Sequence, residues 1–89
     1  MEKRPGYGEA ANNLALVLGA QGDAEGAITV LQKAVQENPV FEMTYVTLSR
    51  IYLRTGRRRE AVQVLEKLLQ RNPGNALGLE VLRQAQAGN

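Results

Sequence analysis

The sequence predicts an all-α protein built from stacked helical repeats. The stretch Gly22–Pro39 recurs as Gly56–Pro73 with an offset of 34 residues, and a fixed period of about 20–50 residues is typical of repeat proteins. Apolar residues recur within each copy at helical spacing, whereas no segment shows the sustained alternation of a half-buried strand. These observations favour antiparallel helix-turn-helix repeats that stack as a short right-handed α-solenoid.

Composition narrows the possible chemistry. The chain has 89 residues, of which 44% are hydrophobic and 22% charged, as is ordinary for one globular domain. A net charge of +2 is too small to predict nucleic-acid or membrane binding by itself. Because cysteine and histidine are both absent, the chain lacks disulfides, thiol chemistry and the commonest general base and metal ligand. We therefore expect no cofactor and no metal.

The sequence also predicts no membrane span, since no apolar run approaches about 18 residues. Met1–Gly8 lacks the apolar core of a signal peptide. Pro5 and Gly6 interrupt the polar start, which predicts a flexible leader over residues 1–7. We expect a soluble, cytoplasmic protein.

The first unit, residues 8–41, predicts two helices. The first begins at about Glu9, and Gly22 suits the left-handed residue that closes a helix. Asp23 offers a capping carboxylate to the second helix, which stops before Pro39 because proline disfavours a helical residue in front of it. The expected inward residues are Ala11, Leu14, Ala15 and Leu18 on the first helix and Ala27, Ile28, Leu31, Ala34 and Val35 on the second.

The second unit, residues 42–75, repeats this arrangement with helices over Met43–Thr55 and Arg59–Arg71. Residues 76–89 complete a fifth helix, over about Asn75–Gln86, and a short tail. Turns of only a few residues make neighbouring helices antiparallel. The expected inward residues are Tyr45, Leu48, Ser49 and Tyr52, then Ala61, Val62, Leu65, Leu68 and Leu69, and on the fifth helix Leu79 and Leu82.

Large and small residues recur in one order in both units. The first unit shows this order through Leu14, Ala15, Leu18, Ala27, Leu31, Ala34 and Pro39, and the second through Tyr45, Leu48, Ser49, Tyr52, Ala61, Leu65 and Pro73. With this pattern the chain resembles the tetratricopeptide repeat family over about Gly8–Arg83. The resemblance implies two repeats plus a C-terminal capping helix, and a scaffold that binds proteins or peptides.

Three residues depart from the family pattern. Ala11 stands where a bulky residue is usual, which predicts a weaker outer contact for the first helix. Leu68 replaces a small residue, so the fifth helix is expected to be pushed outward or accommodated by local repacking. Arg83 replaces another small residue, and a charged residue there suits a capping helix with a wet outer face.

The resemblance also implies a binding surface. In that family the first helices of the pairs line a concave groove that holds an extended peptide or a partner helix. Register places further residues there, namely Glu9, Ala20, Glu80 and Gln84. The residues that we single out for peptide or protein binding are Asn12, Leu16, Met43, Val46, Arg50, Leu53, Arg54 and Leu77.

Each assignment has a simpler alternative. Leu16 and Val46 could pack between adjacent helices. Arg50 and Arg54 could lie on a solvated face and pair with Glu42 or with carboxylates elsewhere. One branch of the family grips the C-terminal carboxylate of chaperone tails with a Lys, two Asn, a Lys and an Arg. The matching positions here are Asn12, Leu16, Thr47, Leu77 and Val81, and none fits, which argues against that activity.

The basic run Arg57–Arg59 allows two interpretations. Three arginines at the start of a helix oppose its dipole, so a solubilising turn is the simpler interpretation. The alternative is a docking patch for acidic peptide, nucleic acid or phospholipid. Glu60 and Glu66 dilute the positive charge, and aromatic residues for base stacking are missing nearby, which makes nucleic acid an unfavoured partner.

Enzymatic activity is not expected. The chain has no histidine, no cysteine, no phosphate-binding glycine loop and no acid pair within a repeat stripe. Gly6-Tyr7-Gly8 lacks the strand-to-helix context of a phosphate loop.

Self-assembly is the alternative to peptide binding. Two and a half repeats are few for a stable array, and Ala10, Leu14 and Val17 give the first helix an apolar outer side. An upstream repeat or a second copy of the chain could cover that side, which would make the protein a homo-oligomer. The regular register is compatible with a piece of a longer repeat protein and with a designed module.

Overall fold

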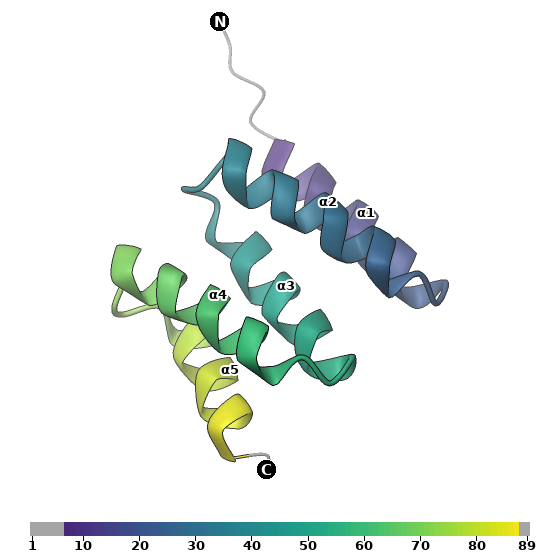
Figure 1. Ribbon diagram of the computed structural model, residues 1–89. Coiled ribbons are helices and arrows are strands. Elements are labelled where there is room, and N and C mark those ends of the chain that lie inside the picture. The colour runs from purple at the N-terminus through teal and green to yellow at the C-terminus, as the bar shows by residue number, and fades with distance from the viewer. Residues whose placement is uncertain (1–6, 88–89) are drawn as a thin grey trace, which may run out of the picture.

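The computed structural model describes residues 7–87 and places them in five helices (Figure 1). The helices are α1 (Tyr7–Ala20), α2 (Ala24–Glu37), α3 (Glu42–Arg54), α4 (Arg58–Arg71) and α5 (Ala76–Ala87). The predicted all-α class is confirmed, with no strand among the described residues. Tyr7, predicted to belong to the leader, already lies in α1, and the rest of that leader falls outside the described residues.

Glycine closes the first helix of each pair in the same way. Gly22 and Gly56 have positive φ angles of 89° and 78°, a region that residues with a Cβ rarely adopt. The amide that follows each glycine then bonds back to the helix, from Asp23 N to Leu18 O at 2.8 Å and from Arg57 N to Tyr52 O at 2.7 Å. Both pairs therefore turn through the same geometry.

Side-chain caps begin α2 and α5. Asp23 accepts a hydrogen bond from the Gly26 amide at 2.9 Å, as predicted, and Asn75 accepts one from the Gly78 amide at 2.7 Å. The Asn75 carboxamide also donates to Glu42 Oε1 at 2.7 Å. Since Glu42 lies in the first turn of α3, this bond ties the start of α5 to the start of α3.

The helices of each pair approach closely at small residues. Ala15 and Ala27 in the first pair and Ser49 and Ala61 in the second are fully buried. Ser49 places a hydroxyl in this dry contact, but it donates to Val46 O at 2.7 Å, so the buried group is satisfied. Small residues at these positions allow each pair to share one core.

Two clusters of buried side chains form that core. One lies between the two pairs and includes Leu31, Leu48 and Tyr52, whereas the other joins α3, α4 and α5 through Leu65, Leu68 and Val81. The inward stripes of α2, α3 and α4 are buried or half-buried as predicted.

The prediction was wrong for Leu14 and Leu79, which are each about half exposed. No described helix covers their side of α1 or α5. The face of α5 that is buried carries Gly78, Val81 and Ala85 instead.

Leu68 is accommodated by a glycine on the opposing helix. Leu68 is fully buried, and a Cβ at Gly78 would lie only 2.8 Å from its Cδ2 atom. At the preceding interface, 34 residues earlier, the corresponding positions hold Ala34 and Thr44, both fully buried. The large and small residues have therefore exchanged sides, and α5 packs against α4 with local repacking.

We predict that Gly78→Ala lowers the free energy of unfolding by up to about 2 kcal/mol. Overpacking costs about 1–3 kcal/mol, and the better helix propensity of alanine returns about 1 kcal/mol. In a Leu68→Ala background the clash is gone, so the same change becomes neutral or stabilising. Urea unfolding of the four variants of this double-mutant cycle measures the coupling, and additive effects would contradict the proposed contact.

Tyr45 is a buried phenol whose ionisation the fold opposes. Its hydroxyl donates to Pro39 O at 2.8 Å, which ties α3 to the connection between α2 and α3. Burial raises the pKa of Tyr45 above its ordinary value of 10.0; the Arg71 charge opposes this rise and the Glu42 carboxylate adds to it. Because the folded state keeps the proton more tightly, this stabilisation is complete below about pH 10 and is lost as the pH rises through the folded pKa.

We predict that Tyr45→Phe flattens the loss of stability in alkali. Phenylalanine keeps the ring but removes the titrating group and one hydrogen bond, at a cost of about 1 kcal/mol near neutral pH. Urea unfolding from about pH 8 to about pH 11 should show a smaller drop for the variant than for the unaltered chain. Parallel pH profiles for the two proteins would contradict this origin.

Candidate functional site

One continuous surface is formed by α1 and α3, which are the first helices of the two pairs, together with α5. Helix α3 contacts both α1 and α5, while α1 and α5 do not contact each other within the described residues. All of the residues predicted for binding lie on these helices: Asn12 and Leu16 on α1; Met43, Val46, Arg50, Leu53 and Arg54 on α3; and Leu77 on α5. We call this surface the α1–α3–α5 face.

Each helix of this face exposes a large apolar side chain. Leu16 is 52% exposed, Met43 37% and Leu77 42%. Packing between adjacent helices, the alternative interpretation for Leu16, therefore leaves about half of that side chain open to solvent. Unbranched methionine adapts easily to different contact surfaces.

Val46 does not contribute to the exposed surface. It is 1% exposed and packs with Tyr45, Leu65, Leu68 and Val81 in the second core cluster. This burial fits the alternative interpretation, in which Val46 packs between adjacent helices rather than on the floor of an open groove, and α5 adds to the packing around α3 at this point.

Leu53 lies between the core and the surface. It is half-buried against both clusters, and it lines a hollow of about 380 Å³. The other residues of this hollow are Gly56, Arg58, Gln84 and Ala85.

Arg50 and Arg54 are exposed one turn apart on α3. Among the described residues neither guanidinium has a hydrogen bond or an ion pair. Glu42, the partner considered for them, instead accepts hydrogen bonds from Asn75 and from Asn72, the latter at 3.0 Å. The α1–α3–α5 face therefore carries two positive charges that are available to an anionic group.

Asn12 carries a buried acceptor without a donor. Its Oδ1 atom is shielded from solvent and has no hydrogen-bond partner among the described residues. Leaving such an acceptor unpaired costs about 1–3 kcal/mol. Rotation of the side chain toward the surface would let a donor from a bound molecule satisfy it.

The basic run is partly paired within the fold. Arg57 forms an ion pair with Glu25 at the start of α2, which links the two turns that carry them. Arg57 also occupies the N-cap position of α4 without a side-chain capping bond. Arg59 is exposed. Besides any solubilising role of this run, Arg57 therefore links the two repeats.

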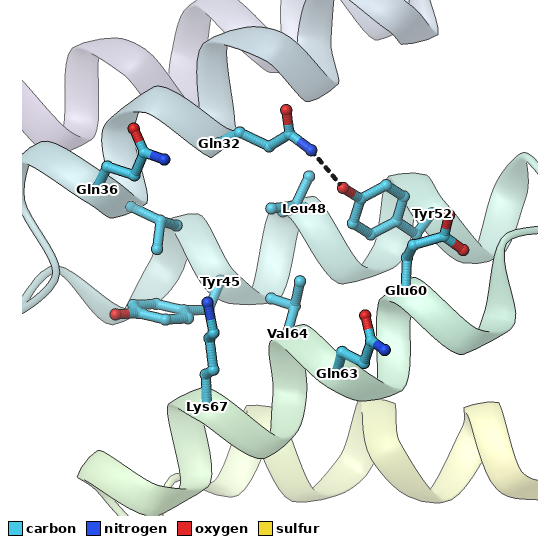
Figure 2. A pocket seen from close by; sticks show the side chains of 10 residues that line it. Gln32, Gln36, Tyr45, Leu48, Tyr52, Glu60, Gln63, Val64 and Lys67 are labelled. Atoms are coloured by element: carbon cyan, nitrogen blue, oxygen red, sulfur yellow. Dashed lines mark hydrogen bonds between the residues drawn. The ribbon is translucent and has the colours of Figure 1, made fainter.

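A second hollow lies on the opposite side, between α2 and α4. These two helices do not contact each other within the described residues, and α3 forms the floor between them. The cleft has a volume of about 400 Å³ (Figure 2). Its lining comprises Gln32, Val35 and Gln36 from α2, Tyr45, Leu48 and Tyr52 from α3, and Glu60, Gln63, Val64 and Lys67 from α4.

We call this hollow the α2–α4 cleft. Its polar rim spans the helices, since Gln32 Nε2 donates to Tyr52 Oη at 2.8 Å (Figure 2). None of the ten lining residues was predicted to bind. The sequence signal for this cleft is three glutamines on the outer sides of α2 and α4, the second helices of the two pairs. The spacing of these glutamines alone does not show that α2 and α4 are separated in space.

Other kinds of site are not evident in the described part of the chain. The helices in that part of the chain are too short or too polar to span a bilayer. No group of three or more acidic, histidine or cysteine side chains gathers there in a way that could hold a metal ion.

Comparison with known proteins identifies the repeat. The chain matches no curated protein sequence. A family model described as tetratricopeptide repeat matches residues 18–85, which is most of the chain and runs from the end of α1 through α2, α3 and α4 into α5. Repeats of this family generally mediate contacts between proteins and act as non-catalytic scaffolds. The 34-residue period, the five packed helices and this match together show that the chain belongs to the tetratricopeptide repeat family.

Proposed function

We propose that the protein is an interaction module that binds a peptide or a partner helix on the α1–α3–α5 face. The observation that carries the proposal is the combination of exposed apolar side chains with two arginines that have no partner in the described part of the chain. Leu16, Met43 and Leu77 come one from each helix of this face, and each leaves apolar area exposed that a ligand could bury. Burial of such a side chain contributes about 1.5–3 kcal/mol.

The charges of this face indicate what kind of segment it binds. Arg50 and Arg54 have no partner among the described residues, so a carboxylate of a bound peptide would meet guanidinium groups that need not leave another ion pair. On rotation of its side chain toward the surface, Asn12 would add an acceptor for a donor of the peptide. The favoured ligand is therefore a segment that combines apolar residues with at least one acidic residue.

We predict that Arg50→Glu combined with Arg54→Glu weakens binding of such segments by about tenfold or more without unfolding the domain. The double reversal turns attraction into repulsion at two sites. It keeps like charges at the same spacing, and the loss of Arg54 from the last turn of α3 costs less than about 1 kcal/mol. The measurement is fluorescence anisotropy with acidic, apolar peptides selected from a display library on the unaltered domain.

The matched control is Arg59→Glu combined with Arg71→Glu, which makes the same change in net charge on α4. This control should retain most of the affinity, since both residues lie off the α1–α3–α5 face. Equal losses of affinity in the two double variants would mean that Arg50 and Arg54 act only through the net charge of the protein. Unchanged affinity in both would remove the arginines from the binding site.

A second candidate function is self-assembly through α1. Leu14 and Val17 are each about half exposed and lie three residues apart, so they occupy one side of the helix. Ala10 is exposed on the same helix. No described helix covers this side, and two copies of α1 could bury it against each other.

We predict that, if α1 mediates assembly, light scattering gives a dimer that persists on dilution and that Leu14→Glu converts to a monomer. A charge at a half-exposed position perturbs the fold little, whereas in an apolar interface it is left unpaired. Met43→Glu is the control, because it places the same charge on the other surface. A monomer at every concentration would exclude assembly through α1 and leave the peptide-binding role standing.

A further inference from the structure

We propose that the α2–α4 cleft is a second binding site, which takes an extended peptide segment with an apolar residue between a basic and an acidic one. This site lies on the side of the molecule formed by α2 and α4 and shares no residue with the α1–α3–α5 face. Its volume of about 400 Å³ falls in the range of ligand-sized clefts.

The centre of the cleft is apolar. Val35 on α2 and Val64 on α4 are half-buried on opposite walls, with Leu48 on the floor between them. Figure 2 shows Leu48 and Val64 directed into this space. One apolar side chain of a ligand would contact all three and would bury area that is now open to water.

The spacing of the rim favours an extended backbone as the occupant. Gln32 and Gln36 are four residues apart on α2, which is about 6 Å along the helix. In an extended chain the backbone groups on one edge repeat every two residues, about 6.6–6.8 Å. A carboxamide both donates and accepts, so each glutamine can bond one amide and one carbonyl of that edge. Gln63 on α4 offers the same chemistry to the other edge.

The charges of the cleft set the order of the ligand residues. Glu60 lies near Tyr52 at one end of the cleft, and Lys67 lies near Tyr45 at the other (Figure 2). They are seven residues apart on α4, or about 10 Å. When the central residue points to the floor, its two neighbours point outward along the rim, where long side chains can reach these charges. A basic neighbour would meet Glu60 and an acidic neighbour Lys67.

The test uses two blocked pentapeptides, Gly-Lys-Leu-Glu-Gly and Gly-Lys-Leu-Lys-Gly, titrated into the protein and followed by amide chemical shifts in NMR spectra. The unaltered protein should bind the first peptide about two- to fivefold more tightly, as expected for one exposed ion pair. Lys67→Glu should reverse the preference by a similar factor, whichever direction the peptide takes. Replacing the central leucine by serine should weaken binding by about tenfold.

The matched control is Lys33→Glu, an exposed lysine on α2 outside the cleft whose carboxylate partner is Glu37. This variant changes net charge equally and should keep the original preference. The Arg50→Glu and Arg54→Glu double variant should also bind as before, which separates this site from the α1–α3–α5 face.

Three results would overturn the proposal. The first is the absence of shifts at cleft amides such as Gln32 and Val64 at millimolar peptide. The second is a preference that Lys67→Glu leaves unchanged. The third is a set of shifts confined to α1, α5 and the α3 residues of the α1–α3–α5 face, with none on the cleft floor, which would support the face proposed above while removing the cleft as a site.

Discussion

The close approach of paired helices at small side chains controls how all the other helices pack. Ala15 lies at the contact between the two helices of the first pair, and Ala61 lies at the same contact in the second pair. Both residues are fully buried. A larger residue at either position would separate the axes and open the core to water, because protein interiors tolerate little overpacking. Since each pair is held at this short distance, its outer residues can form one core with the next pair, and the stack continues.

The same constraint explains why α5 can follow a departure from the repeat pattern. A leucine at position 68 would force α5 away if the opposing residue carried a Cβ, yet Gly78 leaves the required space. Volume at the interface is therefore conserved across the two helices rather than at each position. Asn75 reinforces this placement, since it caps α5 and also donates to Glu42 on α3.

Stacking also divides the surface into two sides with different properties. Helix α3 contacts α1 and α5, so these three helices make a continuous face with exposed Leu16 and Met43 and with two arginines that have no partner among the described residues. Helices α2 and α4 do not contact each other in that part of the chain, and α3 forms the floor of the cleft between them. Residues 7–87 thus offer two separate surfaces, one apolar and basic and the other lined by amides with opposite charges at its ends.

The repeat period, the five helices and most of the core could be predicted from the sequence, because helical periodicity and the signals at Gly22 and Pro39 act locally. The exposure of Met43 could also be predicted, since this residue lies outside the inward stripes, whereas packing between helices remained an alternative for Leu16. Packing between helices settles which apolar residues find a neighbour: Val46 is covered and Leu79 is left open, although both lie on helical apolar faces. Periodicity tells which side of a helix is apolar, whereas the distance between helices that are remote in sequence decides burial, and it also leaves the α2–α4 cleft open.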